Sequence, residues 1–341
     1  MQKKNILTVI LMLSVYYFTL AQSYDKNYKK NLKYRLLVSY IAETRDLTTW
    51  LELNKKIDPA GKEKARLRNS PNLLSGFMFQ ADNIAYYWAA ALPQTTAEIE
   101  KYGRQKSFIT KGSILIDALL INVNYVNQLG FYDQNYLNHP EIKGDTVSYR
   151  RHNNTKLVWT SVDLNYYPAQ RQSCLGVPFY FGERQLKSKF FVGSRLAYNN
   201  IKLNSGQGSL FRDSVHAEDA SLQFASLRYT GLSFAAVPSL YLVAKKKWFI
   251  FFDAALGISV GATKTNVNKS FNPLLQIEIP QAKVATGINT DRFLLALYYT
   301  YLNQTFQSGS LKVGNVLGNF GFLIGLRINQ WRYRHLNWET I

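Results

Sequence analysis

Long stretches of alternating apolar and polar residues constrain the fold of this chain more than any other feature of its sequence. The clearest covers residues 119–132, where Ile121 and Val123 fall on one face and Asn122 and Asn124 on the other. Side chains of a β-strand point alternately to opposite faces, so the pattern indicates strands with one apolar and one polar face. The same alternation recurs in residues 189–199, 248–259, 292–304 and 320–329.

The expected strands are too long for an ordinary soluble sheet. Strands in soluble proteins average about 5–6 residues, whereas crossing a bilayer at a tilt takes about 9–11 residues. We therefore predict an all-β chain that forms a single antiparallel transmembrane β-barrel of about 12 strands. The alternative is a soluble barrel or sandwich whose apolar faces point into a core.

The connections between these strands are expected to alternate between short and long. Short periplasmic turns and long extracellular loops are typical of outer-membrane barrels. Keeping this parity requires one long first strand over residues 33–54, and a strand over residues 177–201 that follows a turn at Pro168–Gly176. The short connections are 81–82, 115–118, 243–246 and 289–291, and the long ones are 55–70, 93–104, 133–155, 202–228 and 262–274.

Aromatic residues near the strand ends predict two belts, one at each membrane interface. Five aromatics lie beside expected periplasmic turns, namely Tyr166, Tyr167, Tyr241, Trp248 and Phe293. Four lie near expected external ends, namely Phe131, Tyr132, Tyr198 and Tyr301.

The first residues predict export. Lys3 and Lys4 precede the apolar stretch Ile6–Phe18, which is too short to cross a bilayer as a helix. Such an arrangement is typical of a signal peptide, and we place cleavage between Ala21 and Gln22. The expected organisation is a signal peptide (1–21), a periplasmic segment (22–32), an outer-membrane barrel (33–329), and a basic tail or the end of the last strand (330–341).

The chain is strongly basic, with 41 Lys and Arg against 22 Asp and Glu, a net charge of +19. Export excludes nucleic acid as the partner of this charge, and exposed lysines are expected to bind phosphates of outer-membrane lipids and glycolipid. Inward cations would line a lumen that favours anions, or would pair with inward acids in a plugged core. The candidate lumen-lining residues are Lys111, Lys189, Arg195, Arg292 and Arg327, with Asp117, Asp163 and Asp253 as the acids.

No motif for a metal or nucleotide site occurs, so no cofactor is expected. Asp213, Ser214 and His216 have the residue types of a nucleophilic triad, but they fall in an expected loop without an oxyanion-hole signature. The sequence therefore predicts a non-enzymatic small pore, ligand-binding or structural envelope protein. A lipid hydrolase of the outer leaflet, using these three residues, is the alternative.

Four segments resemble a Gram-negative family of outer-membrane β-barrels, found mainly in the Bacteroidetes, whose function is unknown. They are QKSFITKGSILIDALLINVNYVNQLGFY (105–132), SPNLLSGFMFQADNIAYYWAAALP (70–93), LVWTSVDLNYY (157–167) and GERQLKSKFFVGSRLAYNNIK (182–202). The resemblance implies a barrel inserted by the barrel assembly machinery and implies no activity. Many such barrels end on an aromatic residue that this machinery reads, whereas this chain continues through QWRYRHLNWETI to Ile341.

Overall fold

A computed structural model describes residues 26–32, 35–53, 64–70, 72–116, 118–137, 149–168, 181–206, 225–265, 274–308 and 311–329. The regular elements of this part are strands β1 to β15 and one short helix, α2 (Thr96–Tyr102). No helix among the described residues is long and apolar enough to cross a membrane.

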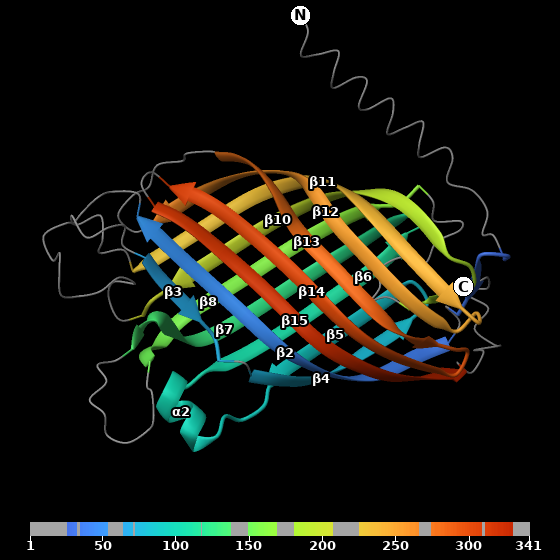
Figure 1. The fold of residues 1–341 in the computed structure, drawn as a ribbon, viewed down its shortest axis with the longest axis horizontal. Coiled ribbons are helices and arrows are strands. Elements are labelled where there is room, and N and C mark those ends of the chain that lie inside the picture. Colours follow the sequence, from blue (N-terminus) through green and yellow to red (C-terminus); the bar gives the residue numbers. More distant parts are fainter. Residues whose placement is uncertain are drawn as a thin grey trace, which may run out of the picture.

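Twelve long strands close into one antiparallel barrel (Figure 1). The large sheet has 13 strands, and the additional pairings β15–β2 and β7–β6 leave only the short β3 outside the ring, so 13 − 1 gives twelve. The predicted antiparallel barrel and its strand count are confirmed. The ring consists of β2 (Arg35–Leu53), β4 (Asn72–Ala81), β5 (Ile84–Ala91), β6 (Lys106–Ile116), β7 (Leu119–Leu137), β8 (Tyr149–Tyr166), β10 (Lys189–Asn204), β11 (Ser226–Ala244), β12 (Trp248–Thr265), β13 (Leu274–Asn289), β14 (Phe293–Ser308) and β15 (Leu311–Asn329).

The outer surface of the barrel is apolar, as the alternation predicted. Leu232 is 54% exposed and Leu326 63%, and their strand neighbours are buried; Phe190 is 60% exposed. A band of exposed large apolar side chains around a closed barrel is the surface that a bilayer core requires. We call the end with the short turns β4–β5, β6–β7, β11–β12 and β13–β14 the periplasmic end, and the opposite end the external end.

Toward the external end, a different set of strands forms the barrel wall. There β4, β5 and β6 stop short, and β3 (Lys64–Arg68) pairs with both β2 and β7 in their place. Amide side chains satisfy the backbone groups at this step: Asn69 accepts from the Leu47 amide at 2.6 Å, and Gln105 accepts from the Ser70 amide at 2.7 Å. The long loop expected over residues 55–70 is therefore wrong for residues 64–68, which form β3 and pair in register with five residues of β2 and two of β7.

Two expected features of the connections are wrong. No strand covers residues 177–201; β10 begins at Lys189, and the preceding described residues instead form the short β9 (Glu183–Gln185). That strand pairs with β1 (Lys29–Asn31) in a separate two-stranded sheet, which we call the plug sheet. In addition, the external connection between β14 and β15 is only residues 309–310.

The expected aromatic belts are only partly present. Trp248, Phe293 and Tyr198 are exposed on the outer surface, but Tyr167 and Tyr241 are buried in the interior. These two were misassigned because a position beside a turn does not determine to which face a side chain points.

Phe131 is also buried inside instead of lying in the external belt. Tyr132 is buried too, but on the outer face, where it pairs in register with Arg68 and its ring centroid lies 4.9 Å from that of Tyr102 in α2. The register between β7 and β8 shifts between Leu129 and Phe131, and Gly130 between them has a φ of 82°. A bulge of this kind adds one residue and reverses the faces that follow it. Phe131, expected on the same face as Leu129, therefore points inward.

Candidate functional site in the barrel interior

A belt of ionisable side chains crosses the middle of the lumen. All of its members are inward-facing and buried, and they come from six strands around the ring. Four are cationic and three acidic, so the net charge of the belt is 4 − 3 = +1. The charged belt consists of Glu43, Arg45, Lys111, Asp163, Arg195, Asp253 and Lys283.

Most charges of the belt are paired. Arg195 Nη2 donates to Asp163 Oδ1 at 2.8 Å, and Lys283 Nζ lies 3.7 Å from Asp253 Oδ2. Breaking a buried pair of this kind costs about 3–5 kcal/mol, because the remaining charge is left in a poorly solvating interior. The pairing corresponds to the plugged-core alternative.

Glu43 and Arg45 form the other pair, on β2. Arg45 Nη2 lies 3.5 Å from Glu43 Oε1, and Arg45 Nη1 donates to Ser107 at 2.6 Å. Tyr298 Oη donates to Glu43 Oε2 at 2.8 Å over the intervening strand β15. This hydrogen bond connects β14 to β2 on the inner face of the barrel and fixes the acid that balances Arg45.

Gly321 leaves the space that Tyr298 occupies. A Cβ at this position would lie 2.4 Å from the Tyr298 ring and 2.9 Å from the Glu43 Cβ. We expect Gly321→Val to lower the free energy of unfolding by about 1–3 kcal/mol, since overpacking pushes Tyr298 away from Glu43. Urea unfolding in lipid vesicles measures this change. Gly112→Val is the matched control, because a Cβ there would meet no atom within 4 Å; equal destabilisation by both variants would contradict the prediction.

A small cavity of about 40 Å³ lies at the level of the belt. Lys111, Asp163 and Lys283 line it, together with the polar side chains of Asn124 and Asn319. This volume holds about three water molecules and is far from a continuous channel. Four apolar side chains from four strands bound the cavity on its external side, namely Ile109, Val126, Leu302 and Leu317.

Further toward the external end, the lumen is filled by an apolar core. Leu157 and Ile201 are completely buried, and Trp159 Nε1 donates to Asn199 at 3.1 Å. The rings of Tyr229 and Phe306 stack with their centroids 4.3 Å apart. Large side chains from several strands therefore meet where an open pore would have water.

The plug sheet closes the periplasmic end. Lys29 Nζ lies 2.9 Å from Glu183 Oε1, and both side chains are almost completely buried. The amide of Phe181, next to the plug sheet, donates to Gln80 at 2.7 Å, and the Phe181 ring contacts Phe249 with centroids 6.2 Å apart. These contacts connect the plug sheet to the ends of β4 and β12.

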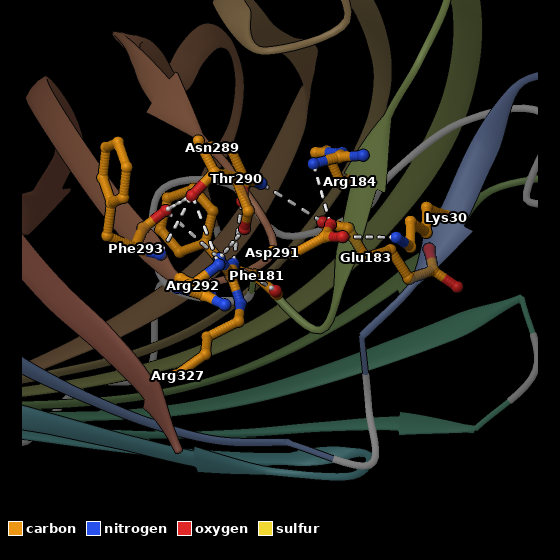
Figure 2. A network of polar contacts seen from close by, with 10 residues as sticks. All are labelled: Lys30, Phe181, Glu183, Arg184, Asn289, Thr290, Asp291, Arg292, Phe293 and Arg327. Carbon is orange, nitrogen blue, oxygen red and sulfur yellow. Dashed lines mark hydrogen bonds and ion pairs between the residues drawn. The ribbon is translucent and has the colours of Figure 1, made fainter. Parts of the chain in front are cut away.

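Arg327 binds the plug to the turn between β13 and β14 (Figure 2). Its guanidinium donates to Asn289 Oδ1 at 2.8 Å and to the Phe181 carbonyl at 3.3 Å, and also to the carbonyls of Thr290 and Phe293. These four acceptors are uncharged. Arg327 therefore holds the plug to the turn by hydrogen bonds, as a clamp in the mouth of the barrel at its periplasmic end.

Asp291 adds an outer contact to this clamp. It pairs with Lys30 of β1 and, at 2.8 Å, with Arg184 of β9, so that one carboxylate holds both strands of the plug sheet (Figure 2). The side chains of Lys30 and Asp291 are 43% and 34% exposed. Arg184 is only 14% exposed. The Lys30–Asp291 pair is therefore screened by salt and is worth at most about 1 kcal/mol, whereas the Arg184–Asp291 pair is screened less.

The structure brings together four of the lumen candidates in the charged belt: Lys111, Asp163, Arg195 and Asp253. Lys189 is half-buried at the periplasmic end, with Nζ 5.7 Å from the Tyr28 ring centroid. Arg292, expected inside, is exposed, because it lies in the β13–β14 turn where strand parity does not apply.

Some predicted residues lie outside the described part of the chain. They are Asp117, the triad Asp213, Ser214 and His216, the signal peptide, and the tail 330–341. The sequence reasoning missed Glu43, Arg45 and Lys283 of the belt, and the Lys29–Glu183 pair. Glu43 and Arg45 had a usable signal, since they share a face at i and i+2 of the predicted first strand. In the described ranges, no cluster of three or more His, Cys, Asp or Glu side chains could hold a metal ion.

Comparison with solved structures finds outer-membrane proteins at low identity. The outer membrane protease OmpT from Escherichia coli is 9% identical, with a TM-score of 0.35, and the match covers 88% of this chain and 98% of that one. The translocator domain of the autotransporter NalP from Neisseria meningitidis is 12% identical over 95% and 98% of the two chains, with a TM-score of 0.35. An outer membrane channel from Pseudomonas putida F1 is 8% identical over 89% and 100%, with a TM-score of 0.30.

No curated protein matches the sequence. A family model does match, and it covers residues 22–327, which is nearly the whole of the expected mature chain. The chain belongs to the family described as Domain of unknown function (DUF4421).

Proposed function

We propose that the protein is a non-enzymatic barrel of the outer membrane whose lumen is closed in the described state, and that its role is structural or ligand-binding. The apolar outer surface supports the membrane location. The short turns gathered at one end of the barrel support the orientation in which that end faces the periplasm. The enzymatic alternative depends on the triad in residues 213–216, and nothing in the described part of the chain adds a partner to it.

The filling of the lumen carries this proposal. A permeating ion would have to pass the plug sheet, then the charged belt, and then the layer formed by Ile109, Val126, Leu302 and Leu317. Apolar constrictions exclude ions because an ion that loses its hydration shell there gains no replacement ligands. The belt itself is held by its own ion pairs, so its charges are engaged with one another. The closed lumen supports a barrel that is not a permanently open pore.

A second candidate function, a gated pore, is favoured by the weak outer fastening of the plug. Among the described residues, Asp291 pairs with Lys30 and Arg184 at the edge of the plug sheet, and the Lys30–Asp291 pair is partly exposed to solvent. An opened mouth would expose a belt with net charge +1 beside Arg327, so the gated form would prefer anions, as the lumen cations predicted.

Asp291→Ala tests the gate. Losing the pairs with Lys30 and Arg184 should cost at least about 1–2 kcal/mol in plug binding, which raises the population of the open mouth by at least roughly 5- to 30-fold. In planar bilayers we expect rare openings with an anion-selective reversal potential under a salt gradient. The control is Arg292→Ala, which changes an exposed residue of the same turn and should show no channel openings. A silent Asp291→Ala variant would rule out this gate and leave the closed barrel as the better account.

A further inference from the structure

A row of three cations crosses the outer wall at its external end. Lys202 of β10 pairs in register with Arg228 of β11, and Arg228 pairs with Lys264 of β12. All three side chains are exposed, whereas their neighbours Leu203 and Leu227 are buried in the lumen. The three therefore point outward, side by side, and we call them the cation row.

Lys156 extends the cation row on β8. It pairs with Asn204, while Lys202 pairs with Val158, so Lys156 and Lys202 are diagonal neighbours on adjacent strands. Among the described residues, no ion pair or hydrogen bond is made by the side chain of Lys156, Lys202, Arg228 or Lys264. Like charges directly opposite each other on a sheet are destabilising, so this arrangement favours an anion that bridges them.

Two external cations on the other side of the barrel are balanced by acids. Arg68 Nη2 lies 2.7 Å from Asp46 Oδ2, and Lys312 of β15 pairs in register with Glu52 of β2. The rim formed by β8, β10, β11 and β12 differs, since no acidic residue among those described pairs in register with its cations Lys156, Lys202, Arg228 and Lys264. The unbalanced charge is thus a local feature of one face and does not follow from the basic composition alone.

Below the cation row, the wall changes from polar to apolar in two steps. Asn200, Thr230 and Ala262 form the next outward row and are half-buried. Tyr198, Leu232 and Val260 follow and are exposed by 38%, 54% and 45%. This order of charge, hydrogen-bonding groups and apolar surface matches the order of groups in a phosphorylated lipid entering a bilayer.

We propose that this face is a binding site for a phosphorylated lipid of the external leaflet. Its phosphates would lie on Lys202, Arg228 and Lys264, its polar headgroup on Asn200 and Thr230, and its acyl chains on the apolar rows below. Neighbouring strands are about 4.8 Å apart, so the cation row spans about 10 Å. That length suits a lipid with more than one phosphate. The inference rests on the proposed membrane location of the barrel.

The test compares two variants that each lose three external cations. The row variant is Lys202→Ala with Arg228→Ala and Lys264→Ala. The matched control is Arg68→Ala with Lys312→Ala and Arg66→Ala, of which Arg66 is an exposed residue of β3. Each purified protein in mild detergent is titrated with a diphosphorylated glycolipid, and the complexes are counted by native mass spectrometry. We expect the row variant to bind roughly 100-fold more weakly than wild type and the control to bind as wild type.

Two further titrations distinguish binding of the whole lipid from binding of phosphate alone. The same lipid with its phosphates removed should bind the wild type as weakly as the row variant binds the intact lipid. Inorganic phosphate alone should bind far more weakly than the lipid, because it gains nothing from the apolar rows. Equal binding of the intact lipid by the row variant and wild type would overturn the site, as would equal losses in row and control variants. Because binding is measured in detergent, its failure is distinct from a failure of the closed-lumen proposal, which conductance tests.

Discussion

Arg195→Glu should prevent the barrel from folding stably. The substitution removes the 2.8 Å pair with Asp163 and places a second carboxylate beside it in a site where Arg195 is 3% exposed. Loss of one partner of a buried pair costs about 3–5 kcal/mol, and repulsion between two buried carboxylates adds to it. Marginal stability of about 5–15 kcal/mol leaves little reserve against a loss of this size. Heat-modifiable gel migration and urea unfolding in vesicles measure the folded fraction.

Arg228→Glu is the matched control for this charge reversal. It makes the same change in net charge on the adjacent strand β11, but on the exposed outer rim. It should unfold within about 0.5 kcal/mol of wild type. If Arg195→Glu folds as well as Arg228→Glu, the belt is not a paired core. In that case the lumen cations are free to determine selectivity, as an anion-favouring pore would require.

Glu183→Ala should release the plug sheet. Lys29 would keep its charge at 2% exposure without the carboxylate that lies 2.9 Å away, at a cost of about 3–5 kcal/mol. Withdrawal of β1 into the periplasm relieves this cost, because Lys29 then becomes hydrated. Amine-reactive labelling followed by mass spectrometry should find Lys29 protected in wild type and modified in the variant.

The double variant Glu183→Leu with Lys29→Met separates charge from packing. Replacing both partners of a buried pair with apolar residues of similar size is often neutral, so the plug should stay in place. Proteolysis between β1 and β2 should then be as slow as in wild type, and faster in Glu183→Ala. Equal protection of Lys29 in wild type and Glu183→Ala would contradict the assigned role of this pair.

The sequence alone was sufficient for the barrel because each strand carries its own alternation. The first strand, predicted at 33–54, is β2 (Arg35–Leu53), and the turn at 115–118 joins β6 to β7. Parity also placed Lys111, Asp163, Arg195 and Asp253 on inward faces. Such assignments need only the local period of two residues and no knowledge of the neighbouring strand.

Features that depend on partners distant in the sequence could not be predicted from the sequence. Lys29 and Glu183 are 154 residues apart, and neither shows by itself that it pairs inside the periplasmic mouth. The bulge at Gly130 reverses the expected orientation of Phe131, and a single glycine in a strand does not predict a bulge with certainty. Arg292 was misassigned because it follows the last paired residues of β13, where alternation ends.

Single-channel recording of the wild-type protein in planar bilayers tests the closed lumen most directly. The filled external core, the paired belt and the plug sheet predict a flat current at moderate voltage, with no steady conductance. Addition of the refolded protein, checked by heat-modifiable migration, should leave the bilayer as resistive as before. A steady, reproducible open level in wild type would contradict the closed lumen and establish a permanent pore.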